Sequence, residues 1–151
     1  MLLELTTSLD APLELAWQAV KKPDTFRYVT GGLLSVSESE PWPERWGVGE
    51  SFQGRLYLLG VVPAWRHCIT IVELDETRHL IRTEEHGGPL RGWNHLLHFE
   101  AAPNGRCRYT DRVQVRAGLL TLPIWLFAQG FFRYRQFRWR KLARRLHADG
   151  V

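Results

Sequence analysis

The stretch from Gly31 to Ala117 constrains the fold most, because it reads as six consecutive β-strands. Alternating apolar and polar residues, or an enrichment in β-branched residues, mark each strand. Turn signals such as Pro103-Asn104-Gly105 separate them. Strands that follow one another through short connections predict an antiparallel meander. The predicted strands are Leu33 to Glu40, Glu50 to Leu59, Ala64 to Asp75, His79 to His86, Gly92 to Ala102 and Arg106 to Arg116.

One more strand and two short helices are predicted before this meander. Alternation from Leu3 to Leu9 indicates the strand. Asp10 is the expected N-cap of a helix that has Pro12 in its first turn and continues to Val20. A second short helix is expected from Asp24 to Tyr28.

A long amphipathic helix is predicted at the end of the chain, from Pro123 to about His147. No other element is long enough to cover the apolar face of so long a sheet, so the strands have to curl around it. We therefore predict an α+β helix-grip fold, in which a seven-stranded curved antiparallel sheet wraps around the C-terminal helix and two short helices follow strand 1. A cavity is expected between sheet and helix. The apolar stripe of the helix is predicted to comprise Ile124, Phe127, Phe131, Tyr134, Phe137 or Arg138, Leu142 and Leu146.

Composition favours a single domain over 1–151, since 44% of the 151 residues are hydrophobic and 24% are charged. Cys68 and Cys107 lack metal-ligand spacing and are expected to be free thiols in a reducing cytoplasm. No export signal is recognised at the N-terminus. The longest uncharged run, 117–132, is shorter than the roughly 20 residues that span a bilayer. We expect a cytoplasmic protein, monomeric or homodimeric, without a cofactor.

The chain resembles the START-like superfamily, also described as SRPBCC or polyketide cyclase/dehydrase and lipid-transport proteins. The resemblance covers nearly the whole length and rests on the opening motif 9–17, Leu-Asp-Ala-Pro-Leu-Glu-Leu-Ala-Trp, on Trp46-Gly47-Val48-Gly49, and on the terminal helix. It implies a helix-grip container for a small hydrophobic ligand. Members carry lipids, hormones or quinones, or cyclise polyketides, and no single enzymatic signature is shared across them.

Strand alternation predicts which side chains face the cavity, because every second residue shares a face. Each predicted inward row is apolar at one end and polar at the other, so the polar ends are expected to meet at one mouth of the hollow. Phe127 and Phe131 on the terminal helix complete the predicted lining. The predicted ligand-binding residues are Trp65, His67, Glu85, Trp93, His95, Tyr109, Asp111, Phe127 and Phe131.

The polar residues of this set allow more than one interpretation. They could orient a ligand in an apolar cavity, or form a hydrogen-bond network that only joins strands. His95, Asp111 and Tyr109 are the candidate catalytic acid/base groups, because a carboxylate can orient an imidazole. A zinc site from His67, His95 and Glu85 or Asp111 would match in ligand type, but the spacing does not single it out, and we predict no metal. Trp42 and Trp46 lie in a loop that could cap the cavity.

The basic, aromatic segment Arg133 to Arg145 contains no acidic residue. The favoured interpretation is a solvated face whose arginine stems cover apolar surface. Peripheral contact with an anionic membrane comes second. Nucleic-acid binding is not expected, because the seven cations of this segment leave a body of 13 bases and 16 acids.

Three functions follow, in order of preference. The first is a non-enzymatic binding or carrier domain for a lipid-like, aromatic or isoprenoid ligand. The second is an aromatase/cyclase or dehydratase-type enzyme. The third is a membrane-associated accessory protein that acts through the terminal helix.

Overall fold

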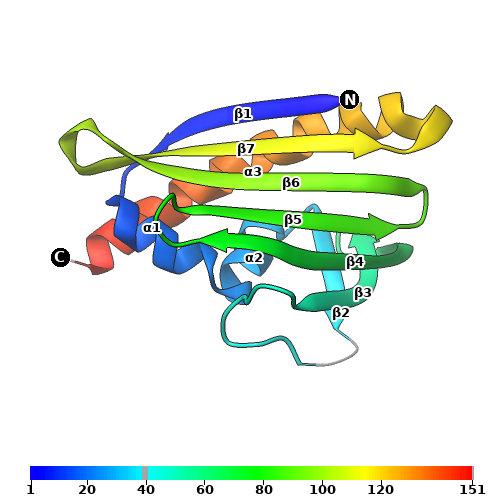
Figure 1. Cartoon of the computed structure of the whole chain (residues 1–151), viewed down its shortest axis with the longest axis horizontal. Helices are drawn as coiled ribbons and strands as arrows, with labels where there is room; N and C mark the ends of the chain where they lie inside the picture. The colour runs from blue at the N-terminus through cyan, green and yellow to red at the C-terminus, as the bar shows by residue number, and fades with distance from the viewer. Residues whose placement is uncertain (39–40, 151) are drawn as a thin grey trace.

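The computed structural model describes residues 1–38 and 41–150, and within them a seven-stranded antiparallel sheet curves along the long helix α3, Thr121–Asp149 (Figure 1). The strand order is β1-β7-β6-β5-β4-β3-β2. After β1, Leu2–Leu9, come the short helices α1, Leu13–Val20, and α2, Pro23–Thr30. The other strands are β2, Leu34–Glu38, β3, Ser51–Leu58, β4, Val62–Asp75, β5, Leu80–Gly87, β6, Leu90–Ala102, and β7, Arg106–Arg116.

The predicted fold class is confirmed, with seven strands, two short helices after the first strand and a long C-terminal helix. Irregularities in the strand pairing at Arg55/Tyr57, Ile71/Glu73 and Glu85/Gly87 accompany the curvature, since β-bulges bend a strand and increase its twist. The predicted end of the second strand at Glu40 lies outside the described residues.

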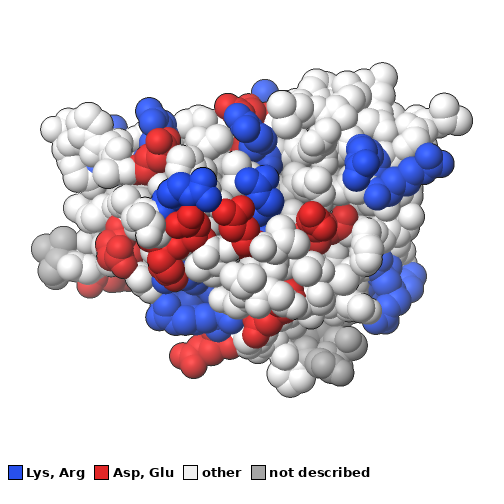
Figure 2. Space-filling view, viewed as in Figure 1, with Lys and Arg blue, Asp and Glu red and all other residues white. Residues whose placement is uncertain are grey.

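The inner face of the sheet and the three helices enclose two apolar clusters. The cluster at the α1 end packs Trp17, Phe99, Tyr109 and Trp139 together, and all four are almost fully buried. The other lies toward the start of α3 and includes Trp93, Phe131 and Phe132. On the outer face of the sheet, acidic and basic side chains intermingle (Figure 2), in ion pairs such as Arg108 with Glu100 and Arg112 with Glu4.

The prediction that Asp10 caps α1 is wrong. The N-cap is Pro12, without a side-chain hydrogen bond. Asp10 stands two residues earlier, and its carboxylate instead pairs with Arg106 at 2.5 Å and Arg144 at 3.6 Å. Because the Asp10 carboxylate pairs with these two guanidinium groups, it does not cap the N-terminus of α1.

The stripe predicted for α3 is also partly wrong. Phe127 and Phe137 are 46% and 45% exposed, whereas Arg135 and Gln136 are each 5% exposed. Because aromatic residues lie on several sides of this helix, apolar spacing alone does not identify the face that packs on the sheet. The buried residues are Ala128, Phe131, Phe132, Arg135, Gln136, Trp139 and Ala143.

Candidate functional site

A cavity of about 390 Å³ lies between the sheet and the first half of α3, within the size range of small-molecule sites. Strands β2 to β6 supply one wall, and α2 and α3 supply the other. Most of the wall is apolar, so burial would provide most of the affinity for a ligand. Apolar lining residues include Leu34, Val36, Leu56, Leu58, Trp65, Ile69, Leu90, Trp93, Ile124, Phe127, Phe131 and Phe132.

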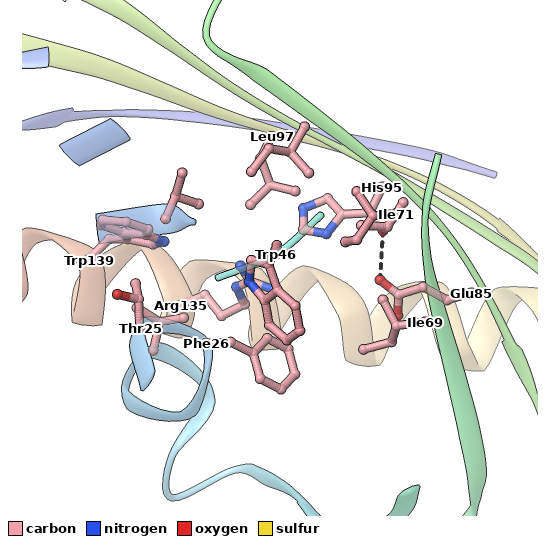
Figure 3. A pocket seen from close by; sticks show the side chains of 14 residues that line it. Thr25, Phe26, Trp46, Ile69, Ile71, Glu85, His95, Leu97, Arg135 and Trp139 are labelled. Carbon is pink, nitrogen blue, oxygen red and sulfur yellow. Dashed lines mark hydrogen bonds between the residues drawn. The ribbon is translucent and has the colours of Figure 1, made fainter. Parts of the chain in front are cut away.

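A second cavity of about 60 Å³ lies deeper along α3, toward α1 and α2 (Figure 3). Val20, Thr25, Trp46 and Trp139 line it but do not line the larger cavity. The two cavities are neighbours along α3, because some residues line both. These shared residues are Phe26, Ile69, Glu85, His95 and Arg135.

The first polar group of the wall joins β4 to β5. His67 Nε2 lies 2.8 Å from Glu85 Oε2, and the Thr83 hydroxyl donates to Glu85 Oε1 at 2.9 Å. Burial alone would raise the pKa of Glu85, but the hydrogen bond and the charge from His67 outweigh it and lower the pKa. Glu85 is therefore an anion in the cavity wall whose two oxygens already accept hydrogen bonds.

The second polar group joins β6, β7 and α3. Asp111 Oδ1 lies 2.7 Å from His95 Nε2 and accepts the Tyr109 hydroxyl at 2.5 Å, and Asp111 Oδ2 accepts from Gln136 Nε2 at 3.3 Å. Burial opposes ionisation of Asp111, but the hydrogen bond from His95 and the charge of Arg135 outweigh it, so the pKa is lowered. Burial, and then the charge of Asp111, raise the pKa of Tyr109. The group is a buried carboxylate that fixes the ring of His95, and His95 is its member in the wall of both cavities.

The predicted site residues fall into two sets. The strand alternation places Trp65, His67, Glu85, Trp93 and His95 in the lining of the larger cavity, where Phe127 and Phe131 join them. Tyr109 and Asp111 face the same side of the sheet but are 0% exposed and line neither cavity. The prediction that they share one open polar mouth is therefore wrong, because His95 and α3 cover them.

Arg135 is a charged wall residue that the sequence analysis does not predict. It lies four residues after Phe131 and four before Trp139, on the helix face turned to the cavities. The favoured interpretation of the sequence places it on a solvated face with the other cations of the segment. Its spacing from these two aromatic residues is the signal that could have identified it.

The other predicted features are placed as follows. Trp46 lines the smaller cavity and packs with Phe26, Trp42 and Phe52 in an aromatic cluster. Among the described residues, no three His, Cys, Asp or Glu side chains are arranged to hold a metal ion. No helix within 1–38 and 41–150 combines the length and hydrophobicity required to traverse a bilayer.

Much of the basic half of α3 is used inside the fold. Arg138 donates from Nε and Nη2 to the Tyr28 carbonyl at 3.1 and 2.9 Å, and Arg140 donates to Thr7 Oγ1 at 3.0 Å. These bonds tie α3 to α2 and β1. Part of this segment therefore stabilises the packing of α3 on its neighbours, and only the rest of it is a solvated face.

Comparison with known proteins gives no match to a protein-family model and no match among curated proteins. The fold is similar to that of an aromatase/cyclase from Streptomyces sp. R1128, with a TM-score of 0.68 and 15% identity over 96% of this chain and 94% of that one. A START superfamily protein from Mycobacterium smegmatis gives a TM-score of 0.70 and 9% identity over 96% and 98% of the two chains.

Norcoclaurine synthase from Thalictrum flavum, in complex with dopamine and hydroxybenzaldehyde, gives a TM-score of 0.65 and 12% identity over 94% of this chain and 85% of that one. The resemblance drawn from the opening motif and the terminal helix is thus confirmed at the level of the fold. In its sheet order, its two short helices and its long terminal helix, this chain has the helix-grip fold, which it shares with the START superfamily protein and the aromatase/cyclase described above.

Proposed function

We propose that this protein is a binding or carrier domain for a small hydrophobic molecule held between the sheet and α3, and that it acts without catalysing a reaction. The observation that carries the proposal is the cavity of about 390 Å³, whose wall is mostly apolar and contains a few polar groups. Its aromatic wall residues, Trp65, Trp93, Phe127 and Phe131, suit an aromatic or isoprenoid body.

The residues that bind this ligand are, in our proposal, those that reach the cavity. Trp65, Trp93, Phe127 and Phe131 would pack on its apolar body, while His67, Glu85 and His95 would face its polar groups. Tyr109 and Asp111 act indirectly, by holding the ring of His95.

The test is a fluorescence titration with Nile red, a neutral apolar dye. Ile124 and Leu126 lie two residues apart on α3, but only Ile124 lines the cavity, whereas Leu126 is 57% exposed. The variant Ile124→Trp places an indole in the cavity, and the dye must displace this indole in order to bind. Because burial of one aromatic side chain is worth over about 1.4 kcal/mol, dye binding should weaken about tenfold or more.

Leu126→Trp adds the same side chain outside the cavity and should leave dye binding unchanged. Absence of binding to the wild type, or equal affinities of the two variants, would refute the cavity as the binding site.

A second candidate function, an aromatase/cyclase or dehydratase-type enzyme, is favoured by one observation. His95 lines both cavities while Asp111 holds its Nε2 at 2.7 Å, an arrangement that suits general acid/base catalysis. Turnover of an aromatic or polyketide-like substrate that falls about a hundredfold in His95→Asn would support this function. Turnover unchanged in that variant would exclude His95 as the acid/base group.

Peripheral contact with an anionic membrane is a third proposal. Among the basic residues from Arg133 to Arg145, Arg133, Lys141, Arg144 and Arg145 are exposed, and Phe137 is exposed beside them. Exposed cations next to an exposed aromatic ring suit the surface of an anionic bilayer. Such contact would let a carrier exchange an apolar ligand with the membrane, in the cytoplasm as we expect.

A further inference from the structure

The smaller cavity contains two buried hydrogen-bond donors without acceptors. Arg135 Nε and Trp139 Nε1 each have less than 1 Å² of accessible surface and no hydrogen-bond partner among the described residues. Both side chains line this cavity, one helical turn apart on α3. In Figure 3, the ring nitrogen of Trp139 is on the edge of the ring that faces Arg135. Because both groups can only donate, they require an acceptor there.

Arg135 is also a buried cation without an ion-pair partner. It is 5% exposed, and no carboxylate of the described residues lies within ion-pair distance of it. Its guanidinium interacts with the Tyr109 hydroxyl and stacks over Phe132 at 5.3 Å. Asp111 attracts it electrostatically but already accepts from His95, Tyr109 and Gln136. A buried charge in this position is costly unless an opposite charge compensates it.

The remaining charged group of the wall does not compensate Arg135. Glu85 lies across the pocket beside Ile69 in Figure 3, while Arg135 lies beside Phe26. Its oxygens already accept from His67 and Thr83. Arg135 and Trp139 therefore offer their donors at the α3 side of the smaller cavity, separate from Glu85 on the sheet. Two other unpartnered nitrogens, Trp65 Nε1 and His67 Nδ1, belong to side chains in the sheet wall of the larger cavity.

The sizes of the two cavities suit the two parts of an amphipathic molecule, a small polar group and a larger apolar body. The smaller one, at about 60 Å³, has room for a group of a few atoms, and the larger, at about 390 Å³, is lined mostly by apolar side chains. Arg135 belongs to the wall of both.

We propose that the ligand is an amphipathic organic acid, whose anionic oxygens bind Arg135 and Trp139 in the smaller cavity and whose apolar body fills the larger one. This inference rests on the proposed binding function and specifies its ligand class. Arg135 supplies charge-assisted hydrogen bonds, which are stronger than neutral ones and favour the acid over a neutral molecule of the same shape. Trp139 adds a neutral donor to the same oxygens.

The experiment compares decanoate with decanol, which share the alkyl chain and differ in the charge of the head group. Titration calorimetry at about pH 8, where the acid is ionised, should show about ten- to a hundredfold tighter binding of decanoate to the wild type, the range expected for hydrogen bonds to a charged group. In Arg135→Gln, this preference should fall to a few-fold while decanol affinity is retained. Arg133→Gln, which removes an exposed cation from the same helix, should retain the full preference.

Trp139→Phe keeps an aromatic ring and removes only the Nε1 donor, so it tests the site independently of Arg135. It should reduce decanoate affinity several-fold and decanol affinity less, because a donor binds a charged oxygen more strongly than a hydroxyl. Equal binding of decanoate and decanol to the wild type would overturn the inference and leave the binding function intact. A wild type that binds decanoate, decanol and Nile red equally poorly would overturn the binding function itself.

Discussion

Replacing Asp111 with Asn tests whether a buried anion organises the far side of the site. The carboxylate is 0% exposed and accepts hydrogen bonds from His95, Tyr109 and Gln136. An asparagine can keep one acceptor oxygen, but its amide nitrogen would then face the Gln136 donor. The variant also removes the negative charge that attracts Arg135.

The expected cost follows from these contacts. The bonds from His95 and Tyr109 lose their charge assistance, at about 0.5 to 2 kcal/mol each, and the longer bond from Gln136 is lost, at about 1 kcal/mol. The free energy of unfolding should therefore fall by about 3 kcal/mol, at the lower end of the range for breaking a buried ion pair. For a domain of this size, the melting temperature should drop by about 6 to 12 °C.

Urea unfolding at neutral pH, followed by tryptophan fluorescence, measures this difference. The matched control is Arg112→Ala at the next position, which breaks an exposed ion pair with Glu4 whose side chains are 54% and 45% exposed. That control should change the free energy of unfolding by less than about 1 kcal/mol. If Asp111→Asn costs no more than the control, Asp111 is not the organising anion of the network.

Three further predictions follow. The stability difference between the wild type and Asp111→Asn should shrink in acid, because the folded-state pKa of Asp111 is lowered. The stabilisation by Asp111 is present above its unfolded pKa of 3.8 and is lost as the pH falls through its folded pKa. A stability difference that grows in urea titrations at acid pH would contradict this prediction. Cys107 should resist iodoacetamide in the native protein, because burial raises its pKa to about 11, and mass spectrometry showing native labelling as fast as in urea would contradict this. Exposed cations of α3 should make the protein float with anionic liposomes at low salt and less so at high salt, and flotation unchanged in Arg133→Gln combined with Lys141→Gln would place the contact elsewhere.

Strand alternation was enough to predict most of the wall on the sheet side. His67 is two residues from Trp65 along β4, and His95 is two residues from Trp93 along β6. Because every second residue of a strand faces the same side, the alternation predicted correctly that both histidines line the cavity. The depth of each residue along the curved strands was not predictable in this way. Tyr109 and Asp111 share the inward face, but α3 packs directly over them and excludes them from the cavities.

The buried face of α3 was harder to predict from the sequence, because it includes polar and charged residues that are usually exposed. Arg135 and Gln136 are buried by partners from other elements, including the Leu5 carbonyl, which accepts from Gln136 at 2.7 Å. No local pattern encodes such long-range partners. Asp10 failed as a predicted cap for the same reason, since Arg106 and Arg144 reach it only in the folded chain.

Native mass spectrometry tests the central claim, a cavity that holds one small hydrophobic molecule, most directly. Freshly purified wild type should retain one small molecule per chain. Wild type mixed with equimolar decanoate and decanol should also retain one molecule per chain, and the bound molecule should be decanoate more often than decanol. The variant Ile124→Trp should appear mostly as the bare chain, and Leu126→Trp should behave like the wild type. Bare wild-type protein under both conditions, or equal retention by the two tryptophan variants, would contradict the account.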